Sequence, residues 1–197
     1  MAATRPIRNL GRPRDETIDR RVLEAARGLL VELGFEGTTM QAISSRSGVH
    51  PSAIYRRWPS RFEIIEQAVF PGLDPAATRP TGDLRRDLRR FIRSYLSVLG
   101  EPATRAALPG LLATYQAGRN PPEAAWLTVS ARPHLQDILL AAGPALADPA
   151  ADPDDVFDVL LGAMLARILV PTVAQRGRPV DTLVDMVLRL VEPGLTR

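Results

Sequence analysis

The chain has 197 residues, of which 45% are hydrophobic and 24% are charged, and it contains no cysteine. This composition is ordinary for a globular protein, and it excludes disulfide bonds and thiolate metal sites. The sequence contains neither an apolar run of about 18 residues, which a membrane span needs, nor the apolar N-terminal stretch of a secretory signal. We therefore expect a cytoplasmic protein without a membrane partner.

The charge is distributed unevenly along the chain. Residues 1–61 contain eleven arginines and six acidic residues, a net charge of +5, whereas residues 62–197 have a net charge of −2. A basic front part on a neutral-to-acidic body indicates a polyanionic partner for the front part alone. A solvated N-terminal tail would carry the same charge, so the charge by itself leaves both interpretations open.

The predicted elements are helices throughout, and they begin after a basic arm at residues 1–14 that shows no hydrophobic period. The first amphipathic helix is expected to start near Asp15, and Gly34 stands where a helix end favours a residue with positive φ. The apolar stripe of this helix has helical spacing and consists of Ile18, Val22, Ala25, Ala26, Leu29, Leu30 and Leu33.

Three short helices are predicted next. Gly48 ends the first of them, Pro51 fits the first turn of the second, which should reach about Trp58, and the third should end near Phe70. Capping boxes open the first and the third of these helices, and they consist of Thr38 with Gln41 and of Ser60 with Glu63.

The rest of the chain predicts longer helices. A linker rich in Pro and Gly separates them from the front part at residues 71–82. Their expected positions are residues 84–99, 103–117, 122–141, 152–170 and 179–192.

The two short helices that meet at Gly48 form a predicted helix-turn-helix. Gly48 supplies a turn without a Cβ clash, and Val49 can fill the core beneath it. Apolar side chains should lock the two helices together, namely Ile43, Ile54 and Trp58. The outward residues of the second helix should then be His50, Ser52, Ala53, Tyr55 and Arg56. A short helix with small and hydrogen-bonding side chains at its tip can enter the major groove of DNA.

The residues around this turn resemble the DNA-binding region of the TetR family of transcriptional regulators. The resemblance rests on GTTMQAI at residues 37–43, GV at 48–49 and AIYRRWPSRFE at 53–63. It implies an all-α fold of about nine helices, with a three-helix DNA-binding domain at residues 15–62. A helical effector-binding and dimerisation domain would then occupy residues 63–197.

The resemblance also implies roles for individual residues. The Thr38 hydroxyl should bind a phosphate, and Tyr55 should lie against the DNA backbone or a thymine methyl. Ser60 and Arg61 should contact phosphate at a helix start, where an anion is favoured in any case. Within residues 38–61, the residues expected to contact the duplex are Thr38, Thr39, His50, Pro51, Ser52, Ala53, Tyr55, Arg56, Ser60 and Arg61.

This sequence departs from the usual family pattern at three of these positions. His50 stands where the family often has Ser, Ser52 where it often has Gly, and Arg61 where Lys is usual. These differences should change the operator sequence rather than the ability to bind DNA. Two alternatives stay open, since Tyr55 could be a core aromatic and His50 could only cap its helix.

Three further arginines, Arg12, Arg14 and Arg57, are candidates for DNA contact. Arg12 and Arg14 in the arm could enter a narrow minor groove, whose negative potential attracts Arg, or could make loose phosphate contacts. At least one of Arg56 and Arg57 should meet a phosphate.

The last two predicted helices are apolar on more than one side, whereas a surface helix of a monomer needs one apolar stripe. We expect the surplus to be buried against a second copy about a two-fold axis, as the resemblance also implies; burial within one chain is the alternative. Such a dimer fits a pseudo-palindromic operator, with its reading helices about 34–36 Å apart. The expected interface residues are Phe157, Leu160, Leu161, Met164, Ile168, Leu183, Val187 and Leu190.

The resemblance implies an effector site as well, because members of the family usually bind a small ligand between their middle helices. The candidate lining residues are Phe91, Tyr95, Leu111, Leu112, Tyr115, Trp126, His134 and Met164. Aromatic and aliphatic walls of this kind suit a small apolar or aromatic effector. The same residues would also pack the core of a protein that binds no ligand.

The sequence carries no signature of an enzyme, a cofactor or a metal site. It has no P-loop, no dinucleotide fingerprint and no zinc-protease pattern, and its two histidines stand far apart. We predict a DNA-binding transcriptional regulator, specifically a repressor that a small effector releases from its operator. The alternative is a helical DNA-binding or adaptor protein that a protein partner controls without a small effector.

Overall fold

The computed structural model of the chain describes residues 16–72, 78–116, 131–142, 152–170 and 179–191. These residues contain helices and no strand, which confirms the expected all-α class. The helices are α1 (Glu16–Gly37), α2 (Met40–Ser47), α3 (Pro51–Tyr55), α4 (Arg61–Val69), α6 (Leu84–Gly100), α7 (Pro102–Gln116), α9 (Arg132–Ala141), α10 (Pro153–Leu169) and α11 (Pro179–Val191). No helix in the described ranges is both long and apolar enough to cross a bilayer.

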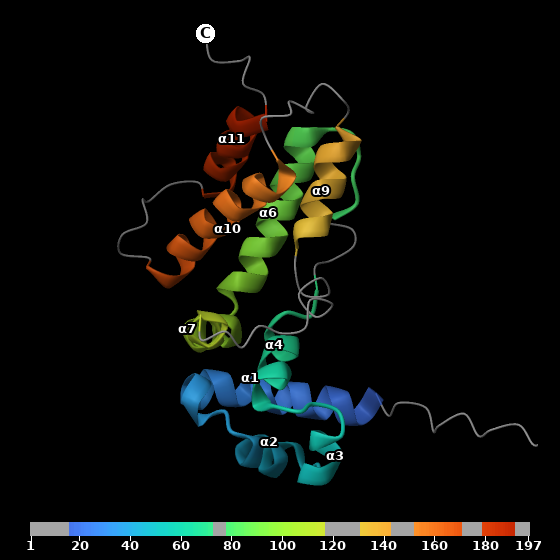
Figure 1. The fold of residues 1–197 in the computed structure, drawn as a ribbon, viewed down its shortest axis with the longest axis vertical. Helices are drawn as coiled ribbons and strands as arrows, with labels where there is room; N and C mark the ends of the chain where they lie inside the picture. Colours follow the sequence, from blue (N-terminus) through green and yellow to red (C-terminus); the bar gives the residue numbers. More distant parts are fainter. Residues whose placement is uncertain (1–15, 73–77, 117–130, 143–151, 171–178, 192–197) are drawn as a thin grey trace, which may run out of the picture.

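The helices form two modules that meet at α1, α4 and α7 (Figure 1). In the lower module α1 lies across the molecule, with α2 and α3 on one side of it and α4 on the other. In the upper module α6, α9, α10 and α11 form a bundle, and α7 lies between this bundle and α1. The short helices α2 and α3 therefore stand at one end of the molecule, away from the bundle.

Each module has its own apolar core. The lower core joins α1–α4 and contains Val22, Ala26, Leu29, Ile43, Val49, Ile54, Trp58, Ile64 and Ala68. The upper core joins the bundle helices and includes Leu88, Phe91, Ile92, Leu135, Ile138, Leu160, Met164, Leu183 and Val187. A third, smaller cluster connects the modules across α1, α4 and α7, and it contains Leu30, Ile65, Val69, Ala107 and Leu111. Apolar burial of this kind holds the two modules against each other.

Three of the described helix starts have the residues that the sequence favours there. Ser60 accepts a hydrogen bond from the Glu63 amide at 3.4 Å at the start of α4, and Asp152 accepts one from the Asp154 amide at 2.8 Å at the start of α10. Pro51 occupies the first turn of α3, as predicted. These side chains satisfy amide groups that a helix start leaves without a backbone partner.

Two local predictions are wrong. The N-cap of α2 is Thr39 and not Thr38, because the Thr39 hydroxyl accepts the hydrogen bond from the Ala42 amide at 3.1 Å. The helix α3 ends at Tyr55, three residues before the predicted end at Trp58. Gly34 has the predicted positive φ of 70° and interrupts the helix there, and the chain makes one further helical turn after it, to Gly37.

Candidate nucleic-acid interface

The turn between α2 and α3 is built on Gly48, which has a left-handed backbone conformation with φ 63° and ψ 23°. Its amide donates to the Ser44 carbonyl at 3.0 Å, and the Ser44 hydroxyl donates to the Val49 carbonyl at 2.7 Å. A Cβ at position 48 would lie 2.9 Å from the Arg21 guanidinium, which itself donates to the Ser47 carbonyl at 2.5 Å. Glycine therefore meets both the conformational and the steric requirement of this turn.

The buried side of α3 is the one that the sequence predicts. Val49, Ile54 and Trp58 are buried in the lower core together with Ile43 of α2. The Trp58 indole N–H donates to the Gln67 side-chain oxygen at 2.8 Å, so its polar atom is satisfied. These contacts fix the rotation of α3 about its own axis.

The opposite side of α3 is solvent-exposed. Tyr55 is 54% exposed, which answers the question whether it is a core aromatic. His50, Ser52 and Arg56 are also exposed, whereas Ala53 is half-buried against the lower core. The exposed side chains combine hydrogen-bonding groups, an aromatic ring and a positive charge, which are the groups that contact bases and phosphates.

His50 has a structural role whether or not it contacts DNA. Its Nδ1 accepts from the Ser52 amide at 3.3 Å and lies 2.9 Å from the Ser52 hydroxyl, so it caps the N-terminus of α3. The cap leaves the ring exposed at the tip of the helix. Capping and DNA contact are therefore compatible for this residue.

The two adjacent arginines after α3 have different environments. Arg57 forms an ion pair with Asp19 near the start of α1, with 2.7 Å between Nε and Oδ1, and its side chain is only 11% exposed. Arg56, directly after Tyr55 in the chain, is exposed. Of this pair, Arg56 is the residue available to a phosphate, and Arg57 holds the end of α3 against α1.

The structure places Thr38 inside the module, although the resemblance implies a phosphate contact for its hydroxyl. Thr38 is 0% exposed, and its hydroxyl donates to the Gly34 carbonyl at 2.8 Å. The phosphate contact of Thr38 stays a prediction, and the burial of the hydroxyl with an internal partner counts against it. The exposed neighbour Thr39 takes the position at the start of α2.

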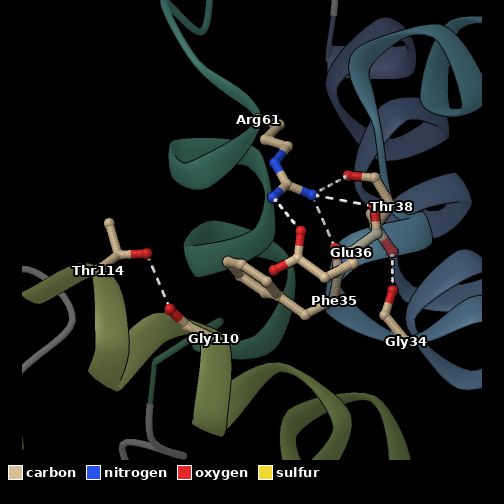
Figure 2. A network of polar contacts seen from close by, with 7 residues as sticks. All are labelled: Gly34, Phe35, Glu36, Thr38, Arg61, Gly110 and Thr114. Atoms are coloured by element: carbon tan, nitrogen blue, oxygen red, sulfur yellow. Dashed lines mark hydrogen bonds and ion pairs between the residues drawn. The ribbon is translucent and has the colours of Figure 1, made fainter.

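Arg61, for which a phosphate contact was expected, is also engaged within the chain (Figure 2). Its Nη1 donates to the carbonyls of Phe35 at 2.8 Å and Thr38 at 3.3 Å, and its Nη2 lies 3.1 Å from a Glu36 carboxylate oxygen. Ser60, the N-cap of α4, is half-buried beside it. Arg12 and Arg14 lie outside the described residues.

The candidate effector residues fall into two separate places. Phe91, Tyr95 and Met164 belong to the upper core, whereas Leu111 and Tyr115 belong to the cluster that connects the modules. Leu112 and His134 are half-buried on α7 and α9, and Trp126 lies outside the described residues. The structure therefore does not bring these residues together around one site.

Within the upper core, three aromatic rings contact one another. The Tyr95 ring stacks on Phe157, with ring centroids 6.3 Å apart, and lies tilted against Phe91 at 5.9 Å. The Arg132 guanidinium lies 4.7 Å from the centroid of the Phe157 ring. Burial raises the pKa of Tyr95 to about 12, against an opposing effect of Arg132, so the hydroxyl stays protonated at neutral pH.

The structure places the residues predicted for the dimer interface in different environments. Five of its eight residues are buried in the upper core of their own chain, where α10 and α11 pack against α6 and α9; they are Phe157, Leu160, Met164, Leu183 and Val187. Leu161 and Ile168 are half-buried, and Leu190 is exposed. The outer face of α10 instead exposes Val159, Gly162, Ala166 and Val170.

Sequence reasoning missed the contacts that join distant segments. The Tyr115 hydroxyl donates to buried Glu66 of α4, and the ring of Phe35 lies against the backbone of Gly110 in α7. A signal for the second contact was present, because a glycine inside a predicted helix often marks a close approach. No comparable signal identified Tyr115 as the partner of Glu66.

Two family models match the chain. "Bacterial regulatory proteins, tetR family" matches residues 22–68, and "Tetracyclin repressor-like, C-terminal domain" matches residues 78–187. The first match contains α2, α3 and the turn at Gly48 and reaches into α4, and the second contains the helices from α6 into α11. The two matches therefore cover both modules.

Individual relatives agree with these matches. An HTH-type transcriptional regulator of Mycobacterium tuberculosis is 31% identical over 177 residues, which cover 86% of this chain and 83% of the relative. One from Bacillus subtilis is 40% identical over 55 residues, or 28% of each chain.

Solved structures show the same fold. A TetR-family regulator of Streptomyces coelicolor superposes with a TM-score of 0.53 at 20% identity, covering 94% of this chain and 98% of its own. A TetR regulator of Agrobacterium tumefaciens gives a TM-score of 0.56 at 18% identity, covering 88% and 93%.

Proposed function

Because the chain belongs to the TetR family of helix-turn-helix transcriptional regulators, we propose that it binds operator DNA as a cytoplasmic homodimer and acts as a repressor. The exposed face of α3, fixed in rotation by the lower core and the Gly48 turn, carries this proposal. It supports insertion of α3 into a major groove, with Tyr55 and Arg56 outward.

The proposed DNA contacts form a narrower set than the sequence predicts. His50, Ser52 and Tyr55 are exposed at positions that can meet base edges or a thymine methyl. Arg56 supplies a phosphate contact, and the start of α2 at Thr39 supplies another, since a helix N-terminus favours an anion. Pro51 is exposed beside them, and the half-buried Ser60 lies at the start of α4.

We propose the outer face of α10 as the centre of the dimer interface. Val159, Gly162, Ala166 and Val170 follow one another at helical spacing on an exposed face. Small residues at Gly162 and Ala166 allow a second helix to approach closely. Leu190 of α11, which is also exposed, extends the apolar surface.

We further propose that a small apolar or aromatic effector binds in the upper module and releases the operator. The Tyr95–Phe157 aromatic group supports this, because it offers flat apolar surfaces with a protonated hydroxyl and a guanidinium beside them. The effector would act by binding a conformation with the wrong spacing of the reading helices more tightly than the DNA-competent one.

A second candidate function is regulation by a protein partner without a small effector. The observation that favours it is that Phe91, Leu111 and Met164 are fully buried against protein side chains. The two candidates differ in a direct measurement, because only the first predicts that aromatic or apolar compounds displace the protein from bound duplex.

The DNA-binding function is tested by selecting genomic fragments on the purified protein and measuring the affinity for the recovered duplex. Tyr55→Ala and Arg56→Ala should each weaken binding, by about 1–3 kcal/mol where a base contact is lost. Arg56→Ala should also reduce the slope of log affinity against log salt by about 0.9. Arg86→Ala on α6 removes the same charge from the upper module and should change neither quantity. Unchanged affinity in both α3 variants would exclude α3 as the reading helix.

A further inference from the structure

Arg61 holds the C-terminal end of α1. Its Nη1 donates to the carbonyls of Phe35, Thr38 and Glu36 at 2.8, 3.3 and 3.4 Å, and its Nη2 pairs with the Glu36 carboxylate at 3.1 Å. These carbonyls belong to the end of a helix, where backbone acceptors lack helical partners and a cation is favoured. The planar fork of an arginine serves the carbonyls with one nitrogen and the Glu36 carboxylate with another, whereas a lysine has a single nitrogen for all of them.

The same guanidinium covers the ring of Phe35, with its Cζ 4.8 Å from the ring centroid (Figure 2). The ring also lies against Gly110 of α7. A Cβ added at Gly110 would lie no more than 2.5 Å from three atoms of this ring, so an alanine there cannot coexist with the present position of Phe35. The ring is therefore held between a side chain of the lower module and bare backbone of α7.

The location of this contact connects it to the reading helix. Gly34, with φ of 70°, redirects the chain so that Phe35 leaves the line of α1. Four residues after Phe35, Thr39 caps α2, and α2 leads through Gly48 into α3. A displacement of the ring on α7 is therefore passed along a short, hydrogen-bonded segment to the helix pair that would read DNA.

We propose that Arg61 and Phe35 are positioning residues, which seat the lower module on Gly110 of α7 and thereby set the orientation at which α3 is presented to DNA. This inference rests on the proposed DNA-binding function. It assigns Arg61 a role in orientation in place of the phosphate contact that family resemblance implies. In a dimer, a change in the angle between the lower module and α7 of each subunit would change the distance between the two reading helices.

The contact between Phe35 and Gly110 is tested first by Gly110→Ala, with Gly100→Ala as its matched control. Both glycines are helical, but a Cβ at position 100 would meet only Ile168, at an ordinary 4.0 Å. Alanine is the better helix former, so without the Phe35 contact both substitutions should stabilise the protein. We expect Gly110→Ala to weaken operator binding about tenfold, as the loss of one base contact would, and Gly100→Ala to leave it unchanged.

Orientation can be measured directly because the chain contains no cysteine. Ser45→Cys, at an exposed position of α2, provides a single spin label in each subunit. Double electron–electron resonance between the labels of a dimer should show a shifted or broadened distance in Gly110→Ala and an unchanged one in Gly100→Ala. An unchanged distance and affinity in Gly110→Ala would overturn the proposal.

Arg61 is tested by salt dependence. If it positions α3, Arg61→Lys should bind as weakly as Arg61→Ala, and the slope of log affinity against log salt should stay at the wild-type value. If it binds a phosphate, Lys should restore binding and Ala should lower the slope by about 0.9. The second outcome would overturn the positioning role.

A double-variant cycle shows whether the effect passes through the ring. Phe35→Ala should remove the effect of Gly110→Ala on affinity, because the added Cβ then meets no ring, and it should also restore folding if Gly110→Ala alone unfolds. An equal effect of Gly110→Ala in both backgrounds would overturn the proposal. A wild-type protein that binds no selected duplex would instead refute the proposed function, so the two failures are distinguishable.

Discussion

The hydroxyl of Tyr115 donates a hydrogen bond to the carboxylate of Glu66 at 2.5 Å, and this bond joins α7 to α4. Glu66 is buried, and burial raises its pKa, with a further increase from Glu63; the bond from Tyr115 opposes both. Burial and the neighbouring Glu66 raise the pKa of Tyr115, which therefore remains a donor. Phe62 contacts the Tyr115 ring edge-on at 5.4 Å between centroids, so the contact is both polar and apolar.

The raised pKa of Glu66 predicts a pH-dependent cost of its ionisation. A carboxyl whose folded pKa exceeds its unfolded value stabilises the fold below the unfolded value, and this contribution is lost as pH rises through the folded pKa. Glu66→Gln keeps an acceptor for Tyr115 without a charge. Its free energy of unfolding, from urea titrations, should therefore increase relative to wild type between pH 4.5 and neutral pH.

The exposed Glu101→Gln is the control, and its difference from wild type should not vary with pH in this way. Tyr115→Phe removes the side-chain donor that Glu66 has among the described residues and should cost about 1–3 kcal/mol at neutral pH. If Glu66→Gln follows wild type at every pH, the charge on Glu66 is not a cost to the fold.

Asp87 is a buried carboxylate with the opposite behaviour. It accepts from the Thr81 amide at 2.6 Å and hydroxyl at 2.7 Å, and Arg90 lies 2.8 Å away. Burial opposes its ionisation, but these bonds and the Arg90 charge outweigh burial and lower its pKa. Its contribution to stability is therefore present above the unfolded pKa of 3.8 and is lost as pH falls towards the folded value.

Asp87→Asn should destabilise the upper module by about 1–3 kcal/mol at neutral pH, because the amide presents a donor to the Thr81 and Arg90 donors. The deficit should shrink in acid, where wild type loses the same charge. Asp137→Asn on the exposed side of α9 provides the matched control. A deficit of constant size across the acid range would show that geometry, and not charge, accounts for it.

The sequence predicts the lower module well because its signals are local. Gly48, Pro51 and Ser60 act through the backbone within a few residues of themselves, and each has the predicted role. The cap of α2 shows the limit of such signals, because the sequence predicts Thr38 and the structure has Thr39 in this role. Both residues can cap a helix, and the choice depends on the additional turn after Gly34, which no local pattern indicates.

The inner and outer faces of α10 could not be told apart from the sequence for a different reason. The helix α10 is apolar around most of its circumference, so the sequence cannot show which apolar side faces its own chain and which faces outward. In the structure Phe157, Leu160 and Met164 are buried in the upper core, whereas Val159 and Ala166 are exposed to solvent. Pairs such as Phe35 with Gly110 depend on tertiary packing across many residues and have no periodic pattern.

The ion pair of Arg57 with Asp19 should contribute measurably to stability. Its atoms are 2.7 Å apart and both side chains are largely shielded from solvent, at 11% and 28% exposure. A double-mutant cycle of Arg57→Ala and Asp19→Ala should give a coupling energy of about 0.5–1 kcal/mol in urea unfolding. Arg56→Ala removes a charge from the neighbouring exposed position and should leave stability unchanged. Additive effects in the cycle would show that Arg57 does not brace α3 through Asp19.

The outer face of α10 predicts the effect of a charge on assembly. Ala166→Glu places a carboxylate at the centre of the proposed dimer face, where a second helix would bury it without a partner, so the dimer should dissociate at concentrations where wild type is dimeric. Ala113→Glu makes the same substitution on the exposed side of α7 and should remain dimeric. Sedimentation velocity measures the mass of each variant, and circular dichroism should show equal helix content. Operator affinity should fall with dissociation, because each monomer then holds one half-site alone. A dimeric Ala166→Glu variant would exclude this face and direct attention to the exposed Leu190 on α11.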